Sequence, residues 1–238
     1  MLLAANTVLG IYLAAAIIPA VILMAYIYKK DKVDKEPIGL LCGCLLMGVC
    51  AAFASIALEM LGETALQMSP VTANSELYII VFAFAVVAAV EEGTKLFFLR
   101  YKTWNSPDFD CSFDGIVYAV FTSLGFAAFE NVKYVFNYGL SVALPRAFLA
   151  IPGHMTFAVV MGVFYSKAMA ARRVGDTAGV RRNFLAAWVA PVLLHGVYDS
   201  CAMLGTAQAS AVFAVFIIFM YALAFIGINR ESKRDHKF

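Results

Sequence analysis

Apolar stretches of about 20 residues alternate with short polar segments along the whole chain. About 20 consecutive apolar residues are enough for a helix to cross the hydrocarbon core of a bilayer. The pattern predicts spans over 2–28, 38–61, 77–99, 113–136, 148–168, 183–204 and 207–228. The first stretch lacks the positively charged start of a signal peptide, so we expect it to be kept as a span. The sequence therefore predicts an all-α, polytopic transmembrane bundle of about seven spans, forming one domain over residues 1–238.

The composition agrees with this pattern. Hydrophobic residues make up 63% of the 238 residues and charged residues only 14%, whereas ordinary globular domains have about 45–50% and about 25%. The lipid bilayer is therefore the first expected partner. The formal net charge is only +2, which gives no reason to expect a nucleic-acid partner. The sequence indicates no oligomeric state.

Basic residues are concentrated in a few connecting segments. The loops 29–36, 100–112 and 167–182 and the tail 230–238 together hold 15 of the 18 Lys and Arg residues. With seven spans, these four segments all fall on one side of the membrane. Short loops rich in Lys and Arg stay in the cytoplasm. We therefore predict an N-terminus outside and a C-terminus in the cytoplasm, and we interpret the basic runs as topological signals.

The third predicted span contains two adjacent carboxylates and an ammonium, Glu91, Glu92 and Lys95. A charge near the bilayer centre costs from about 2.5 to over 10 kcal/mol, so such groups usually face the protein interior and have partners. On a helix, Lys95 lies one turn from both glutamates, which diverge by about 100°. We expect one carboxylate to pair with Lys95 and the other to stay free.

Further ionisable residues lie within three other predicted spans: Glu130, His154, His195 and Asp199. His195 and Asp199 are four residues apart, so they share a helix face, and the carboxylate can orient the imidazole. Gly125 and Gly196 allow neighbouring helices to approach closely near these residues. Pro145 and Pro152 predict an irregular start to the span that contains His154.

The depth of each group follows from its distance along the helix to the expected cytoplasmic end. At 1.5 Å per residue, Glu92 lies about 12 Å deep, Glu130 about 25 Å, His154 about 20 Å and His195 about 18 Å. Three of these depths are similar, whereas Glu92 is shallower. We expect the four spans to form a catalytic core over about 77–204.

Two imidazoles and one carboxylate around an open position are the usual ligands of a catalytic zinc ion. A further carboxylate beside such a site can remove a proton from the metal-bound water. Hydrolysis inside a bilayer needs a water-filled polar pocket, an activated water and an oxyanion stabiliser, and these residue types provide all three.

Four motifs, in this order, resemble those of PrsW-type intramembrane proteases, which are more distantly similar to CAAX prenyl endopeptidases of the Abi type. They are Glu91-Glu92-x-x-Lys95, Phe126-x-x-x-Glu130-Asn131, His154 and His195-Gly-x-Tyr-Asp199. The resemblance covers about residues 85–200. It implies a bacterial integral-membrane endopeptidase of the cell membrane. Such an enzyme cuts a single-pass membrane-anchored substrate, such as an anti-sigma factor, and so starts a stress response.

The resemblance also implies roles for individual residues. The implied catalytic residues are Glu91, Glu92, Lys95 and Asp199, and the implied metal ligands are Glu130, His154 and His195, with Zn²⁺ as the metal. One glutamate of the pair would activate the attacking water. A metal-free glutamate mechanism, with the histidines stabilising the oxyanion, is the alternative. Abi-type relatives have arginine and histidine where this chain has Lys95 and Glu130, which favours the PrsW branch.

Other functions are compatible with parts of the pattern. The Glu91, Glu92 and Lys95 group by itself could be a structural ion pair. Buried carboxylates and histidines also form the relays of ion- or proton-coupled transporters, although such transporters often contain inverted repeats and none is evident here. A non-catalytic receptor with a degenerate pocket is a third alternative, and the complete set of polar motif residues argues against it.

Several remaining polar residues have simpler interpretations. We expect Lys133 to neutralise Glu130, one turn away on the same helix. Asp108 and Asp110 fit a solvated loop, with Asp114 as the N-cap of the following helix. The five cysteines are interpreted as small apolar residues, because their spacing predicts neither a disulfide framework nor a zinc motif.

Overall fold

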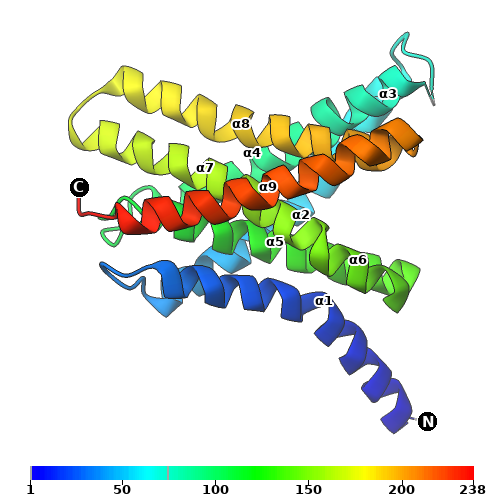
Figure 1. The fold of residues 1–238 in the computed structure, drawn as a ribbon, viewed down its shortest axis with the longest axis horizontal. Helices are drawn as coiled ribbons and strands as arrows, with labels where there is room; N and C mark the ends of the chain where they lie inside the picture. Colours follow the sequence, from blue (N-terminus) through cyan, green and yellow to red (C-terminus); the bar gives the residue numbers. More distant parts are fainter. Residues whose placement is uncertain (1, 74) are drawn as a thin grey trace.

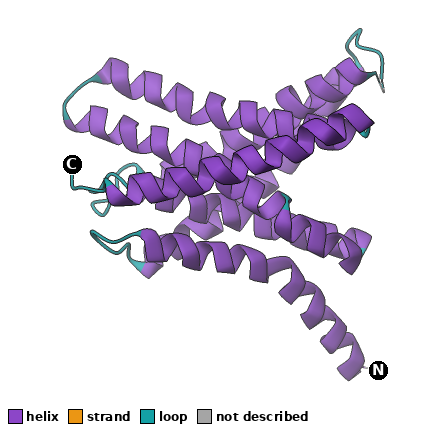
Figure 2. Ribbon diagram, in the orientation of Figure 1, coloured by secondary structure: helices purple, strands orange, loops and turns teal. Residues whose placement is uncertain are grey.

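The computed structural model describes residues 2–73 and 75–238, with side chains described from residue 7 onward. The helices are α1 (Leu2–Lys30), α2 (Ile38–Gln67), α3 (Glu76–Val81), η1 (Phe82–Ala88), α4 (Ala89–Thr103), α5 (Asp114–Tyr138), η2 (Leu140–Val142), α6 (Ala143–Phe148), α7 (Ala150–Arg173), α8 (Thr177–Leu204) and α9 (Ala207–Lys233). Here η1 is a π-helix and η2 a 3₁₀-helix. Figure 2 shows these helices joined by short loops. The predicted all-α class is confirmed.

Seven helical segments of the described chain are long and apolar enough to cross a membrane. The third span is continuous through α3, η1 and α4, and the fifth runs from η2 through α6 and α7. The predicted number of spans is therefore confirmed. We call the end of the bundle next to the basic loops and tail the basic end, and the other the opposite end.

The helices are longer than the apolar stretches that predict them. Residues 62–67, predicted as part of a loop, form the end of α2, and α8 begins at Thr177 instead of residue 183. The Asp176 carboxylate accepts a hydrogen bond from Gly179 N at 2.8 Å and so caps the start of α8. A polar segment outside the hydrocarbon can remain helical when its end is capped. Hydropathy therefore locates the membrane-spanning part of a helix but not the ends of the helix.

α5 lies at the centre of the bundle and packs against α1, α2 and α7 (Figure 1). In the most apolar 18 residues of α5, 72% of the residues are buried. The corresponding shares are 17% for α1 and 22% for α9, which lie at the periphery. Contact between α2 and α5 depends on Gly48 and Gly125. A Cβ at Gly48 would overlap the carbonyl of Thr122, and one at Gly125 the carbonyl of Leu45. The close approach predicted at Gly125 is thus confirmed.

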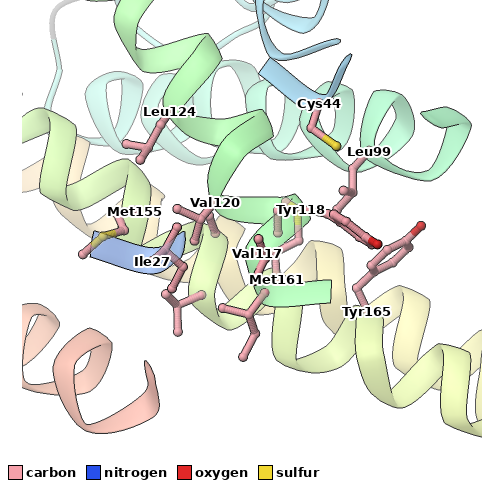
Figure 3. Close-up of a cluster of buried hydrophobic side chains, with 14 of the residues drawn as sticks. Ile27, Cys44, Leu99, Val117, Tyr118, Val120, Leu124, Met155, Met161 and Tyr165 are labelled. Atoms are coloured by element: carbon pink, nitrogen blue, oxygen red, sulfur yellow. The ribbon is translucent and has the colours of Figure 1, made fainter. Parts of the chain in front are cut away.

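Apolar side chains of α1, α2, α4, α5 and α7 form a buried core, most of it in the half of the bundle nearer the basic end (Figure 3). Tyr118, Leu99 and Tyr165 are fully buried there, and the Tyr165 hydroxyl forms a 2.8 Å hydrogen bond with Thr103 Oγ1. Dense packing leaves little room for water in this half. The site residues Glu130, His154 and His195 lie beyond most of this core, toward the opposite end.

Candidate active site

The glutamate pair begins one turn after the π-helix η1, within the same span. Ala89 N donates to the carbonyl of Phe84, five residues earlier, which inserts an extra residue into the turn and rotates the next part of the helix. Single-turn π segments often lie at functional sites. On the facing helix α8, a Cβ at Gly196 would overlap the Phe84 ring, so glycine allows the close packing that the sequence predicts. His195 is thereby held against Glu92.

Lys95 occupies the middle of the polar cluster. Its Nζ lies 3.0 Å from Glu91 Oε2, 2.8 Å from Glu92 Oε1 and 3.2 Å from His154 Nδ1. The ammonium also lies 4.1 Å from the centroid of the Phe126 ring. The expectation that one glutamate would pair with Lys95 and leave the other free is wrong. The lysine side chain reaches back along α4 and contacts both carboxylates.

His195 lies between two carboxylates. Its Nδ1 is 2.9 Å from Glu92 Oε1, and its Nε2 is 3.2 Å from Asp199 Oδ2. The ring stacks on Phe157, with centroids 4.6 Å apart. Carboxylate oxygens accept hydrogen bonds, so the arrangement is satisfied when both ring nitrogens carry a proton. Asp199 is thus placed to orient the imidazole, as its spacing predicts.

His154 has a different environment. Its Nδ1 faces the Lys95 ammonium, which can only donate, so Nδ1 is the acceptor. Its Nε2 lies 3.1 Å from Glu130 Oε2 and donates to that carboxylate. The two partners therefore select the neutral Nε2–H tautomer.

Arg146, on α6, is a site residue that the motifs and their spacing did not reveal. One guanidinium nitrogen lies 2.8 Å from Glu130 Oε2, and Nε donates to Asn131 Oδ1 at 2.8 Å. The guanidinium also lies 3.8 Å from the Tyr134 ring centroid. Arg146 therefore takes the neutralising role expected of Lys133, whose ammonium lies near the Tyr134 ring. A signal was present in the sequence: only Lys95, Lys133 and Arg146 fall outside the basic segments.

A cavity of about 430 Å³ borders this cluster. Its polar lining includes Ser55, Glu59, Glu91, Glu130, Lys133, Arg146, His154, His195, Tyr198 and Asp199. Except for Glu91, which lies near the middle of its span, these residues belong to the half of each span nearer the opposite end. Glu91 lines the cavity and Glu92 does not. Glu92 is fully buried, and its Oε2 has no hydrogen-bond partner among the described residues.

The seven residues that the sequence predicts for the site lie in one hydrogen-bonded cluster. Contacts run in the order Asp199, His195, Glu92, Lys95, His154 and Glu130, with Glu91 joined to Lys95. Glu92 reaches the others despite its shallower estimated depth, because α4 continues to Thr103, beyond the predicted end of the span.

Within this cluster, the donor atoms close enough to share one metal ion differ from the predicted set; a second such group, Asp110, Cys111 and Asp114, lies outside the cluster. Among the described residues, Glu91, Glu92 and His154 each offer a donor atom within 4.8 Å of the other two. We call these three residues the donor triplet. Glu130 and His195 lie on either side of it, bonded to His154 and Glu92. The Lys95 ammonium contacts all three members of the triplet.

Comparison with known protein families identifies the family to which this chain belongs. The family described as PrsW family intramembrane metalloprotease matches residues 36–226, which include all seven site residues. The chain belongs to the PrsW family. The resemblance carried by the four motifs is therefore confirmed, and the protein is an intramembrane protease and a multi-pass membrane protein. The match does not favour the alternative of an ion-coupled transporter.

Relatives in the PrsW family cover most of the chain. A protein named Protease PrsW from Clostridioides difficile (strain 630) is 35% identical over 93% of this chain and 92% of its own length. The Protease PrsW of Bacillus subtilis (strain 168) is 31% identical over 93% of this chain and 94% of its own. That of Geobacillus kaustophilus is 33% identical over 79% and 77%. No solved structure matches the chain.

Proposed function

We propose that this PrsW-family protease hydrolyses a peptide bond of a membrane-anchored protein by means of water activated by Glu91. The observation that supports Glu91 as the general base is its position. Its carboxylate lines the cavity, where substrate and water can meet it, whereas Glu92 is sealed from the cavity. A general base must lie within hydrogen-bonding distance of the proton it removes.

The neighbouring residues have complementary roles in this proposal. Glu91 takes a proton from water as the hydroxide attacks the scissile carbonyl, and later gives the proton to the leaving amine. His195 is held between Glu92 and Asp199, so both of its ring nitrogens are engaged, and it fixes the position of Glu92 beside the cavity. Lys95 fixes both glutamates in position.

The cavity also bears on the substrate. It belongs to the half of the bundle nearer the opposite end, which is the outer half if the N-terminus is outside. A volume of about 430 Å³ admits a few residues of extended peptide, so a helical substrate must unwind locally before cleavage. We propose a single-pass substrate, anti-sigma-factor-like by the family resemblance.

The predicted orientation can be tested separately. An alkaline phosphatase fused to the C-terminus should be inactive if that terminus is cytoplasmic.

Zinc is the cofactor expected from the family, and the residues fit it in type but not in arrangement. A bound zinc ion would supply a Lewis acid and an activated water. However, both nitrogens of His195 contact carboxylates, and those of His154 contact Lys95 and Glu130. Neither imidazole offers a free nitrogen to a metal. The proposed mechanism therefore contains no step at a metal ion.

The test compares the wild type with Glu91→Gln, Glu92→Gln and the exposed control Glu63→Gln in cells. New N-termini within membrane proteins are quantified by mass spectrometry, and thermal stability in detergent checks folding. Removing the general base should lower cleavage by about 10²- to 10⁴-fold in Glu91→Gln. Glu92→Gln should also lose cleavage, because it releases His195 and Lys95, whereas the control should cleave normally. Full cleavage by folded Glu91→Gln would exclude Glu91 as the base, and full cleavage by both variants would exclude this site.

We also propose that residues 1–238 form a single protease domain with a catalytic core over about 77–204. The site residues come from α4, α5, α7 and α8, which all lie within that range.

A further inference from the structure

We propose that the Lys95 ammonium is the resident cation of this site and holds the donor triplet that a divalent metal ion would otherwise occupy. The proposal concerns the same cluster as the proposed function. It rests on the proposed function only in taking this cluster to be the active site. Its test does not, because metal binding can be measured without substrate.

The contacts of Lys95 match those expected of a bound cation. Glu91 Oε2, Glu92 Oε1 and His154 Nδ1 lie 2.8–3.2 Å from its Nζ. An ammonium has three N–H donors and no acceptor, so three acceptors saturate it. The Phe126 ring closes a further side at 4.1 Å, and only 1% of the Lys95 surface is exposed.

A metal ion and Lys95 cannot use these donors together. The three donor atoms suited to a metal lie within 4.8 Å of one another, and the ammonium nitrogen is already in contact with the same three residues. Zinc binds its ligand atoms at about 2.0–2.2 Å, and Nζ already lies among these three side chains. The two cations therefore compete for one position.

Charge explains why removing the lysine should create a metal site. Without Lys95, the buried carboxylates of Glu91 and Glu92 lose their shared cation, and an uncompensated buried charge is strongly destabilising. A divalent ion neutralises two carboxylates and accepts an imidazole nitrogen as a third ligand. The wild-type protein instead supplies its own positive charge, tethered to α4.

The experiment is Co²⁺ titration of purified protein, with visible absorption and metal content per chain as readouts. The variants are Lys95→Met, the double variant Lys95→Met/Glu92→Gln, and Lys133→Met as the matched control from the cavity wall. Lys95→Met should bind about one Co²⁺ per chain, with affinity raised on the order of 100-fold over wild type. The double variant should lose this site, and Lys133→Met should match wild type. Equal affinity in wild type and Lys95→Met, or no binding by a folded Lys95→Met, would overturn the proposal.

A second measurement on the wild type covers the case in which Lys95→Met does not fold. In ¹⁵N-lysine-labelled protein, the Lys95 ammonium signal is identified by its absence from Lys95→Arg. One equivalent of Zn²⁺ should leave that signal in place. Its displacement by Zn²⁺ would show that the lysine yields the position to a metal, which contradicts the proposal. Neither measurement uses cleavage, so failure of the proposed proteolytic mechanism would be seen separately.

Discussion

At the scale of single residues, five of the seven predicted site residues contact a partner from another helix. Glu92 of α4 contacts His195 of α8, and His154 of α7 contacts Glu130 of α5. Arg146 adds α6 to this set through Glu130. Such pairing is what makes charged groups tolerable at membrane depth. It also fixes donor and acceptor roles that isolated residues would not have.

Arg146 should be needed to position Glu130 and, through it, His154. In Arg146→Met the Glu130 carboxylate loses a charged partner while it stays only 18% exposed. We expect about 1–3 kcal/mol of lost stability and reduced cleavage. Arg146→Lys should recover only part of both, because lysine cannot contact Glu130 and Asn131 as a rigid fork. Thermal unfolding and cleavage assays measure the two effects.

Lys133→Met is the control for this prediction, since Lys133 lines the same cavity without pairing with Glu130. A wild-type cleavage rate and stability in Arg146→Met would show that Glu130 needs no guanidinium.

At the scale of elements, the site depends on how α8 meets the π-helix η1. Gly196 lies against the Phe84 ring, and the indole N–H of Trp188 donates to the carbonyl of Ala89 at 3.0 Å. These two contacts align α8 with the end of η1. The extra residue in the π turn then determines which side of the span presents Glu91 to the cavity and which side buries Glu92.

A methyl group at Gly196 should separate these elements. In Gly196→Ala the new Cβ overlaps the Phe84 ring, so the ring must move or α8 must shift away from η1. Overpacking of this kind costs about 1–3 kcal/mol, and the contact between His195 and Glu92 should lengthen. We expect lower thermal stability and a loss of cleavage larger than the stability change explains. Cleavage should partly return in Gly196→Ala/Phe84→Ala.

Gly39→Ala provides the matched control, because a Cβ at Gly39 meets nothing within 4 Å. Alanine favours helix over glycine by about 1 kcal/mol, so this variant should be as stable as wild type or slightly more so. If Gly196→Ala behaved in the same way, close packing at Gly196 would not matter.

At the scale of the whole molecule, the basic end is closed by segments far apart in sequence. The tail pairs with the loop before α5: Phe238 N donates to the Asp110 carbonyl at 2.8 Å. Asp235 Oδ1 accepts from Phe113 N at 2.9 Å and so caps α5. Asp114 is not the predicted N-cap. It is the first residue of the helix, and its carboxylate accepts from Cys111 N.

Two acids in the loop between α1 and α2 should make this closure pH-dependent. Burial raises the pKa of Asp31 to about 6 and that of Glu36 to about 7. Charged or titratable neighbours are Asp34, Lys35, Asp108, Asp114, Tyr118 and Asp235. An opened loop would titrate at about 4, so between pH 4 and 7 the closed form binds more protons than the open form. The closed form therefore loses stability as pH rises through this range.

Amide hydrogen exchange of residues 31–37 and 235–238 measures the effect. After correction for intrinsic rates, exchange should be faster at pH 8 than at pH 5. Glu36→Gln is neutral at both values and should reduce the difference. Corrected exchange that is equal at both pH values in the wild type would contradict the assignment to buried acids.

Much of the fold and of the candidate site could be predicted because the signals are local. Span number follows from hydropathy, and the site residues stand out as ionisable groups within apolar stretches. Arg146 was missed because it lies near a proline on a short helix at the end of a span, where an arginine is unremarkable. The Lys133 expectation failed because one-turn spacing permits contact but cannot rank it against a partner from another helix.

The sequence by itself determined the all-α class, the seven spans and seven members of the polar cluster, but not Arg146. Each of these depends on composition or on spacing within one helix, because a polar group in the hydrocarbon core of the bilayer costs free energy unless it has a partner. Only the tertiary structure decided which glutamate meets the cavity, which nitrogen of each histidine is occupied and which cation fills the donor triplet. Those outcomes depend on differences of an ångström between atoms on separate helices. Such differences are set by the π turn, by the glycine contacts and by packing across the bundle, and no spacing along the chain encodes them.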